Sequence, residues 1–309
     1  MIVVDRLTKT YGSKKAVDDL SFTVTPGRVT GFLGPNGSGK STTMRCMLGL
    51  DAADAGSVTF DGKKYSELDQ PLTHVGSLLD AGDAHKGRSA RNHLWWIAMT
   101  HGFPESRVDE VLQQVGMSDV AKTKVGKFSL GMRQRLGLAV ALLGNPAVII
   151  LDEPANGLDP EGIRWTRDVM RGLADAGRSV LVSSHQLVEL SLVADDLVVI
   201  GQGKLISAGP IAQFMTQHAK SWVRVVSPQF DALASLVIAQ GGTVERTNDG
   251  GDFHAVTAIQ VGEIAAAHNI VLHELSPQTG SLEEAFLDAT DAAVEFRGES
   301  SAVSNTGGQ

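Results

Sequence analysis

The fold of this chain is decided by one segment, Gly34-Pro35-Asn36-Gly37-Ser38-Gly39-Lys40-Ser41. The segment has the form G-x-x-x-x-G-K-[ST], and it stands between a predicted strand at 29–33 and a predicted helix at 41–50. Glycines in this pattern let successive backbone N–H groups turn toward a phosphate chain, and the helix N-terminus adds a partial positive charge. We therefore predict a nucleotide phosphate site, in which Lys40 neutralises the β- and γ-phosphates and the Ser41 hydroxyl binds Mg²⁺.

A second apolar run, at 147–151, is followed by two carboxylates, Asp152 and Glu153. A short run of this kind predicts a buried strand of a parallel sheet. An acidic pair after a strand is by itself most often a solvated turn, but here it follows a phosphate loop in the same chain. We predict that Asp152 holds Mg²⁺ through its water shell and that Glu153 orients or deprotonates the attacking water.

Four further features give the chain a resemblance to a known family. The run Phe-Ser-Leu-Gly-Met-Arg-Gln-Arg at 128–135 is similar to the signature motif L-S-G-G-Q, and the run Gly-Leu-Asp-Pro at 157–160 is similar to a D-loop. His185 follows an apolar run at 180–182, as a switch histidine would, and Tyr11 stands 29 residues before Lys40, where the family places an aromatic that stacks on adenine. Over roughly residues 1–215 the chain resembles the ATP-binding subunits of ABC transporters.

The resemblance implies an ATPase in which two copies pack head to tail as a homodimer and enclose ATP and Mg²⁺ between them. The implied ATP contacts of one copy are Tyr11, Gly34, Pro35, Asn36, Gly37, Ser38, Gly39, Lys40, Ser41 and Thr42. The signature residues supplied by the other copy are Ser129, Leu130, Gly131 and Met132. Glu153 and His185 would be catalytic, Ser41 and Asp152 would bind the metal, and Asp159 would connect the two sites.

Two departures from the family pattern bear on function. Leu130 and Met132 replace a glycine and the glutamine of the signature, and this S-L-G-M form resembles exporter subunits of the antibiotic and multidrug kind. At the Q-loop position the chain carries Asp80 where the family offers glutamine. Aspartate is one methylene shorter and charged, so we expect Asp80 to reach the metal only through water.

The leading function is therefore an ATP-hydrolysing subunit that powers efflux of a hydrophobic, antibiotic-like compound through a separate integral-membrane permease. No stretch reaches the roughly 18 consecutive apolar residues of a membrane-spanning helix, and we expect a peripheral protein on the cytoplasmic face of the membrane. The basic and aromatic segment at 85–96 falls where this family receives its permease, so we expect Arg88, Arg91 or their neighbours to face that partner. The alternative is a solvated helix start with two core tryptophans.

Two other functions stay open. One is an ATP-switched factor acting on the ribosome or on nucleic acid, although the short interval at 42–127 and the single phosphate loop speak against it. The other is an importer subunit, which the ending Leu-Glu-Glu-Ala-Phe-Leu at 282–287 makes less favoured because it resembles drug-exporter subunits.

Net charge differs between the N-terminal two thirds and the C-terminal third of the chain. Its 309 residues carry a formal net charge of −8, which argues against a general nucleic-acid binder, and its one cysteine, Cys46, cannot form an intrachain disulfide. Residues 221–309 hold 3 basic and 12 acidic side chains, a net of −9, which leaves +1 for residues 1–220. We predict an ABC-type ATP-binding domain at 1–220, an accessory domain at 221–290 and a disordered tail at 291–309.

The fold class expected is α/β, a P-loop NTPase core of ABC type with an inserted helical subdomain at about 85–145 and a small C-terminal α+β module. Within the inserted subdomain, helices are expected at 91–101 and 104–115. Further strands are expected at 179–183, and at 197–200 and 204–207 as a hairpin. In the module we expect a β-α-β-β-α-β order, with extended segments at 222–226, 243–247, 253–258 and 270–275 and helices at 230–240 and 261–268. Another helix is expected at 282–289.

Overall fold

The computed structural model describes residues 1–80, 82, 84–184 and 187–290, and it divides them into two compact units. The first unit contains Met1–Ile211 and the second contains Ala212–Ala289. The expected disordered tail at 291–309 and the expected catalytic residue His185 lie outside the described residues. Among the described helices, none has the length and apolar character that a bilayer crossing requires.

The first unit is organised by a six-stranded sheet with the order β5-β6-β7-β3-β8-β9. The strands are β3 (Arg28–Leu33), β5 (Val75–Leu78), β6 (Val148–Asp152), β7 (Ser179–Ser183), β8 (Asp196–Gly201) and β9 (Lys204–Pro210). The first five in that order are parallel, and β8 and β9 form the antiparallel hairpin expected from the sequence. The carboxyl ends of the parallel strands therefore meet at one edge, which is where ligands bind in open α/β sheets.

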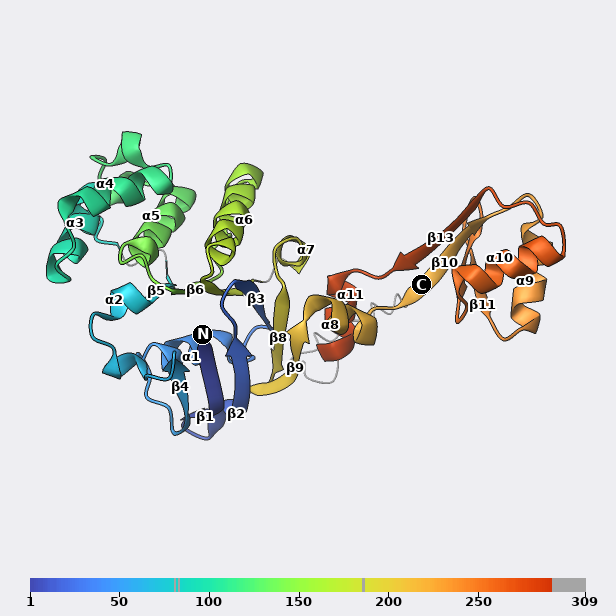
Figure 1. Cartoon of the computed structure of the whole chain (residues 1–309), viewed down its shortest axis with the longest axis horizontal. Coiled ribbons are helices and arrows are strands. Elements are labelled where there is room, and N and C mark those ends of the chain that lie inside the picture. Colours follow the sequence, from blue (N-terminus) through green and yellow to red (C-terminus); the bar gives the residue numbers. More distant parts are fainter. Residues whose placement is uncertain (81, 83, 185–186, 291–309) are drawn as a thin grey trace, which may run out of the picture. The chain divides into compact units, whose positions relative to one another are not determined.

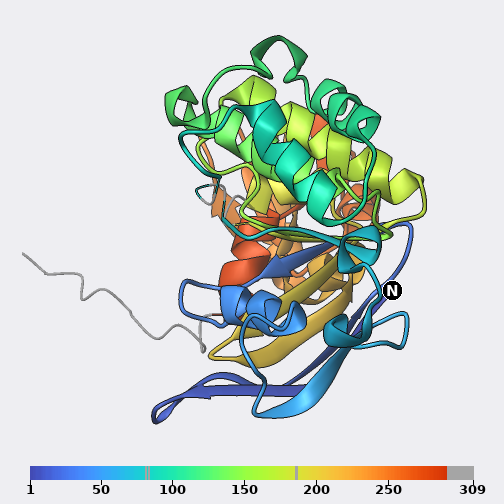
Figure 2. The same cartoon turned by 90° about the vertical axis from the view of Figure 1, so that its left-hand side faces the viewer.

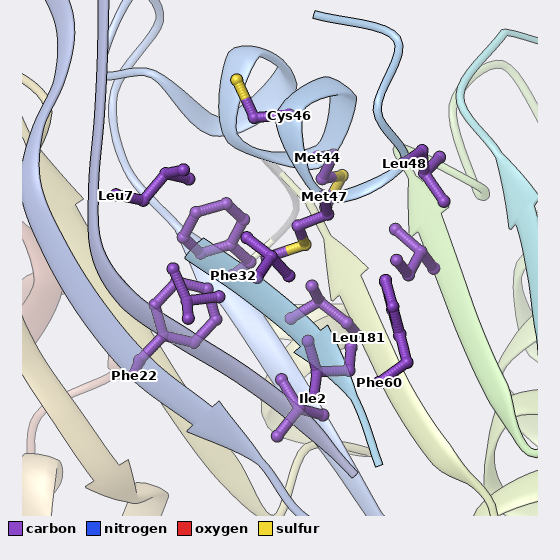
Figure 3. Close-up of a cluster of buried hydrophobic side chains, with 14 of the residues drawn as sticks. Ile2, Leu7, Phe22, Phe32, Met44, Cys46, Met47, Leu48, Phe60 and Leu181 are labelled. Carbon is purple, nitrogen blue, oxygen red and sulfur yellow. The ribbon is translucent and has the colours of Figure 1, made fainter. Parts of the chain in front are cut away.

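The first unit also contains a three-stranded antiparallel sheet, β2-β1-β4. Helix α1 (Lys40–Met47) packs between this sheet and the six-stranded sheet. The strands of the three-stranded sheet are β1 (Ile2–Tyr11), β2 (Lys14–Val24) and β4 (Ala55–Phe60). Figure 3 shows how the two sheets share one core, in which Met44 and Met47 of α1 lie among Phe22, Phe32 and Leu181. The helix that follows the phosphate loop is thus held by apolar contacts on both sides.

The inserted segment is helical, as expected. Its helices are α3 (Ala90–Thr100), α4 (Glu105–Gln114) and α5 (Leu130–Leu142), with single 3₁₀ turns at Ser118–Val120 and Val125–Lys127. Figures 1 and 2 show these helices gathered at one end of the first unit, with the antiparallel strands at the other end. The remaining helices of this unit are α2 (Pro71–His74), α6 (Pro160–Asp175) and α7 (Leu187–Ser191), together with a 3₁₀ turn at Tyr65–Glu67.

The second unit has the expected β-α-β-β-α-β order and forms an antiparallel sheet, β11-β12-β10-β13. Its elements are β10 (Ser221–Val226), α9 (Phe230–Ala239), β11 (Thr243–Arg246), β12 (Gly251–His254), α10 (Ala258–Ala267) and β13 (Glu274–Thr279). Val223, Val225 and Phe253 alternate inward and pack with residues of α9 and α10 in a separate core. The helices α8 (Ile211–His218) and α11 (Leu282–Thr290) precede and follow this sheet.

Two of the expected segments of this unit were wrong in their bounds. The extended segment expected at 270–275 is largely a loop, because Ile270 and Leu272 pack against the core before β13 begins at Glu274. The extended segment expected at 253–258 ends at His254, since Thr257 caps the next helix by accepting a hydrogen bond from the backbone N–H of Gln260. Apolar residues mark contact with the core, and here they belong to connections as well as to strands.

Candidate nucleotide-binding site

The backbone of the phosphate loop requires glycine at two positions. At Gly39 the φ angle is +106°, and an added Cβ would lie 2.3 Å from the carbonyl oxygen of Ala16. At Gly34 an added Cβ would lie 2.5 Å from the carbonyl oxygen of Ile200. The loop is closed by a 3.1 Å hydrogen bond from the Ser38 N–H to the Pro35 carbonyl. The glycines at the first and last positions of the G-x-x-x-x-G pattern are thus required because any larger residue would clash with a backbone carbonyl.

The Lys40 ammonium lies within the curve of this loop. Its Nζ donates hydrogen bonds to the carbonyl oxygens of Gly34, at 2.5 Å, and Pro35, at 3.3 Å. Burial lowers the pKa of Lys40, and the nearby Glu153 and Asp152 carboxylates oppose that shift. A partly desolvated ammonium interacts more strongly with an anion than one in water, so the position suits a phosphate contact.

Ser41 and Asp152 meet at the carboxyl end of β6. The Ser41 Oγ donates a 2.8 Å hydrogen bond to Asp152 Oδ2, and the Ser183 Oγ donates to Asp152 Oδ1. A hydroxyl beside a carboxylate is the oxygen donor set that Mg²⁺ prefers, and the two residues thus fit the metal expected from the sequence. Within the described residues, no group of three or more His, Cys, Asp and Glu side chains forms a separate metal cluster.

Glu153 follows directly and has an unusual backbone conformation. Its φ angle is +50°, and its N–H donates a 3.0 Å hydrogen bond to the Ser183 Oγ. The pocket in front of it measures about 340 Å³. Its lining consists of Ala16, Asn36, Gly37, Ser38, Gly39, Lys40, Ser41, Thr42, Leu79, Asp152 and Glu153. The structure therefore brings most of the expected phosphate-loop residues and both carboxylates into one cavity.

The signature segment begins helix α5. Ser129 is its N-cap, and its Oγ accepts a 3.2 Å hydrogen bond from the Met132 N–H. Leu130 is 43% exposed, and its Cδ2 lies 2.1 Å from where a Cβ on Gly157 would stand. Asp159 caps α6 by accepting a 2.9 Å hydrogen bond from the Gly162 N–H. The signature and the D-loop segment are therefore in direct contact within one copy.

A second cavity, of about 510 Å³, connects the signature to the carboxylates. Leu130 lines it together with Asp80, Asp152 and Glu153. Asp80 Oδ1 accepts a 2.6 Å hydrogen bond from the Gly82 N–H, which shapes the Q-loop position locally. Among the described residues, Tyr11, Ser129, Gly131, Met132 and Asp159 line neither cavity.

Ser183 contacts both site carboxylate residues and was not among the residues expected from the sequence. It is fully buried, and its hydroxyl connects Asp152 to the backbone of Glu153. The available signal was strand register, because Asp152 pairs with Ser183 across the parallel strands β6 and β7. Arg133 and Gln134 of α5, which line the second cavity, were also absent from the expected site.

Comparison with known proteins gives a consistent result. A family model described as "ABC transporter" matches residues 17–156, and one described as a domain of unknown function matches residues 221–283. The uncharacterized ABC transporter ATP-binding protein YhcH of Bacillus subtilis (strain 168) is 37% identical over 300 residues, covering 96% of this chain and 97% of the relative. The bacitracin transport ATP-binding protein BcrA of Bacillus licheniformis is 40% identical over 217 residues, 69% of this chain and 71% of the relative. The dimeric structure of a bacterial ABC transporter cassette, MJ0796, has a TM-score of 0.62 at 22% identity, covering 68% of this chain and 99% of that chain.

Proposed function

The chain belongs to the family of ABC transporter ATP-binding proteins and hydrolyses ATP, and we propose that this hydrolysis powers export of a hydrophobic, antibiotic-like compound through a separate permease. The observation that carries the proposal is the pocket in which Lys40, Ser41, Asp152 and Glu153 converge. The export direction is supported by the S-L-G-M form of the signature and by the similarity to the bacitracin transport ATP-binding protein of Bacillus licheniformis.

In the proposed mechanism the protein acts mainly by positioning and electrostatics. Lys40 binds the β- and γ-phosphates, and the backbone N–H groups of the loop turn toward the same anion. Mg²⁺, held by Ser41 and Asp152, supplies charge neutralisation at the phosphates when bound. Glu153 accepts the proton of the attacking water, and the Ser183 hydrogen bond to its N–H fixes the backbone from which that carboxylate projects.

We propose a head-to-tail homodimer as the active form. The phosphate pocket of one copy lacks Ser129 and Gly131 of its own chain among its lining residues, so a signature segment from a second copy can complete it. A dimeric cassette among the structural neighbours supports the arrangement. Tyr11 is proposed to stack on adenine, Asp159 to connect the two sites, and Asp80 to contact the metal through water. The proposal for His185 at the γ-phosphate rests on sequence, because that residue lies outside the described part of the chain.

The permease is proposed to contact the start of α3, with Arg88 as the charged contact. The Arg88 guanidinium lies 4.7 Å from the ring centroid of Trp96, which is 49% exposed, and Met99 one turn further on is 53% exposed. Arg91 has a different role, since it forms ion pairs with Glu105 at 2.8 Å and Asp109 at 2.9 Å and so connects α3 to α4. Because half of its surface is exposed, Trp96 is a surface residue rather than a core tryptophan.

The variant Glu153→Gln tests the composite site. It should retain ATP, lose most of its hydrolysis, by about 100-fold or more, and elute as a dimer in size-exclusion chromatography with ATP. Glu263→Gln, the same chemical change at an exposed position of α10, serves as the control and should behave like the wild type. A Glu153→Gln protein that binds ATP and stays monomeric, both alone and with its permease, would contradict the homodimer.

A further inference from the structure

The side chain of Tyr11 is hydrogen-bonded to Asp51, which in turn is bound by Arg45 of helix α1. What we infer from this connection rests on the proposed function. Tyr11 is the last residue of β1 and is 49% exposed, so a planar base can reach its ring. Its hydroxyl donates a 2.7 Å hydrogen bond to Asp51 Oδ2. Asp51 is distant in the chain and stands in the connection between α1 and β4.

Asp51 is itself fixed by a second residue. Arg45 donates from Nε to Asp51 Oδ2 at 2.8 Å and from its terminal nitrogen to Oδ1 at 3.2 Å, a two-point contact that sets the plane of the carboxylate. The Arg45 and Tyr11 hydrogen bonds lower the pKa of Asp51, so the acceptor stays ionised, and Asp51 raises the pKa of Tyr11, so the donor stays protonated. Arg45 belongs to the helix that begins with Lys40, and the ring is thereby connected to the phosphate-binding element.

The backbone beside Tyr11 is fixed as well. The Thr10 N–H donates a 2.6 Å hydrogen bond to Asp54 Oδ2, and the Asp54 N–H donates at 2.9 Å to the Thr8 carbonyl. The Lys9 ammonium lies 5.2 Å from the Tyr11 ring centroid. The ring is therefore held at its backbone end by Asp54 and at its hydroxyl end by Asp51.

We propose that Asp51, with Arg45 behind it, is a positioning residue that holds Tyr11 ready for the base of the nucleotide. A free tyrosine side chain must be immobilised when a base stacks on it, whereas this one is ordered beforehand. Loss of this connection should weaken ATP binding by about 2- to 10-fold, the equivalent of ordering one side chain. Binding of the triphosphate portion alone should not change.

The experiment measures ATP and inorganic tripolyphosphate binding, with KM and kcat for ATP, on the full chain. Tyr11→Phe removes only the hydroxyl, whereas Asp51→Ala removes its acceptor together with the two-point contact from Arg45. Both should raise the Kd and KM for ATP equally and leave kcat and tripolyphosphate binding unchanged. The double variant should be no worse than either single variant, and Asp51→Asn, which keeps an oxygen acceptor, should restore most of the affinity. Tyr11→Ala, which removes the ring, should weaken ATP binding most.

The outcomes separate this inference from the proposed function. If Tyr11→Ala loses ATP affinity while Tyr11→Phe and Asp51→Ala match the wild type, the tyrosine remains a stacking platform and the positioning role of Asp51 is wrong. If Tyr11→Ala itself binds ATP normally, both the stacking and the positioning role are wrong. Equal weakening of ATP and tripolyphosphate in Asp51→Ala would mean a general disturbance of α1, which also contradicts the inference.

Discussion

The Ser41 hydroxyl donates a 2.8 Å hydrogen bond to Asp152 Oδ2, and so the phosphate loop is joined directly to the carboxyl end of β6. The other oxygen of Asp152 is occupied by Ser183, from the neighbouring strand. Three elements that are far apart in the sequence therefore fix the position of one carboxylate. Such preorganisation is what phosphoryl transfer requires, since most of its catalysis is positioning.

Ser183→Ala should lower both stability and activity. The change removes a buried hydroxyl that donates to the Asp152 carboxylate and accepts from the Glu153 N–H, and we expect a loss of about 2 kcal/mol in the free energy of unfolding. Ser179→Ala is a matched control on the same strand, because the Ser179 Oγ is buried without a hydrogen-bond partner among the described residues. Urea denaturation and the ATPase rate should separate the two variants, and equal effects would contradict the role given to Ser183.

ATP binding should weaken with rising pH through the loss of the Lys40 proton. Burial places the pKa of Lys40 below the ordinary 10.5, so its charge disappears at a lower pH than that of a free lysine. The hydrogen bond to Asp51 raises the pKa of Tyr11 above its ordinary value. A nucleotide titration at increasing pH should show the decline in the wild type. Lys40→Met should bind about 100-fold more weakly at neutral pH and should lack the alkaline decline. An equal decline in both proteins would exclude Lys40 as its cause.

Gly39→Ala should damage the phosphate loop. The new Cβ would meet the Ala16 carbonyl at 2.3 Å in a backbone conformation of φ +106°, so we expect a loss of about 2 kcal/mol or more in stability together with ATP affinity. Gly172→Ala is the control. Gly172 lies within α6 with no atom within 4 Å of an added Cβ, and the change should stabilise the protein by about 0.5–1 kcal/mol. Thermal unfolding with and without ATP measures both effects, and a Gly39→Ala protein with normal ATP binding would refute the steric argument.

Arg88→Glu should reduce transport without reducing the ATPase activity of the isolated chain, because Arg88 packs on an exposed tryptophan and lies outside the phosphate pocket. Arg91→Glu should instead destabilise the helical insertion, since it replaces two attractions, to Glu105 and Asp109, by repulsions. Transport into vesicles with the permease, set against the ATPase rate of the isolated chain, distinguishes these effects. Normal transport in a folded Arg88→Glu protein would place the permease contact elsewhere.

Strands β6 and β7 were predictable because each carries a continuous apolar run. Strands buried on both faces, such as β6 and β7, carry apolar side chains through their centres, and the polar residues Asp152 and Ser183 mark their carboxyl ends. The three-stranded antiparallel sheet β2-β1-β4 of the first unit was not predicted from the sequence. Its register shifts between Val4 and Leu7, and again between Leu7 and Lys9, so the apolar alternation that would reveal β1 is interrupted.

The site was predictable where the chemistry is local in sequence. The phosphate loop and the pair Asp152 and Glu153 are contiguous runs, and the structure places them along one pocket. Ser183 and Asp51 could not be found in that way, because each acts through a partner brought close by folding. The roles of Arg88 and Arg91 likewise depend on their neighbours, since the sequence placed both in one basic segment and only the structure separates them.

The contact between Leu130 and Gly157 restricts which sequences this fold can accept. Leu130 Cδ2 occupies the space that a side chain at position 157 would need, and Gly157 has a φ angle of +72°. A larger residue at 157 therefore becomes tolerable only if position 130 becomes small and the new residue accepts a left-handed backbone. We expect the two positions to vary together during evolution, because the residue at one position determines which residues fit at the other.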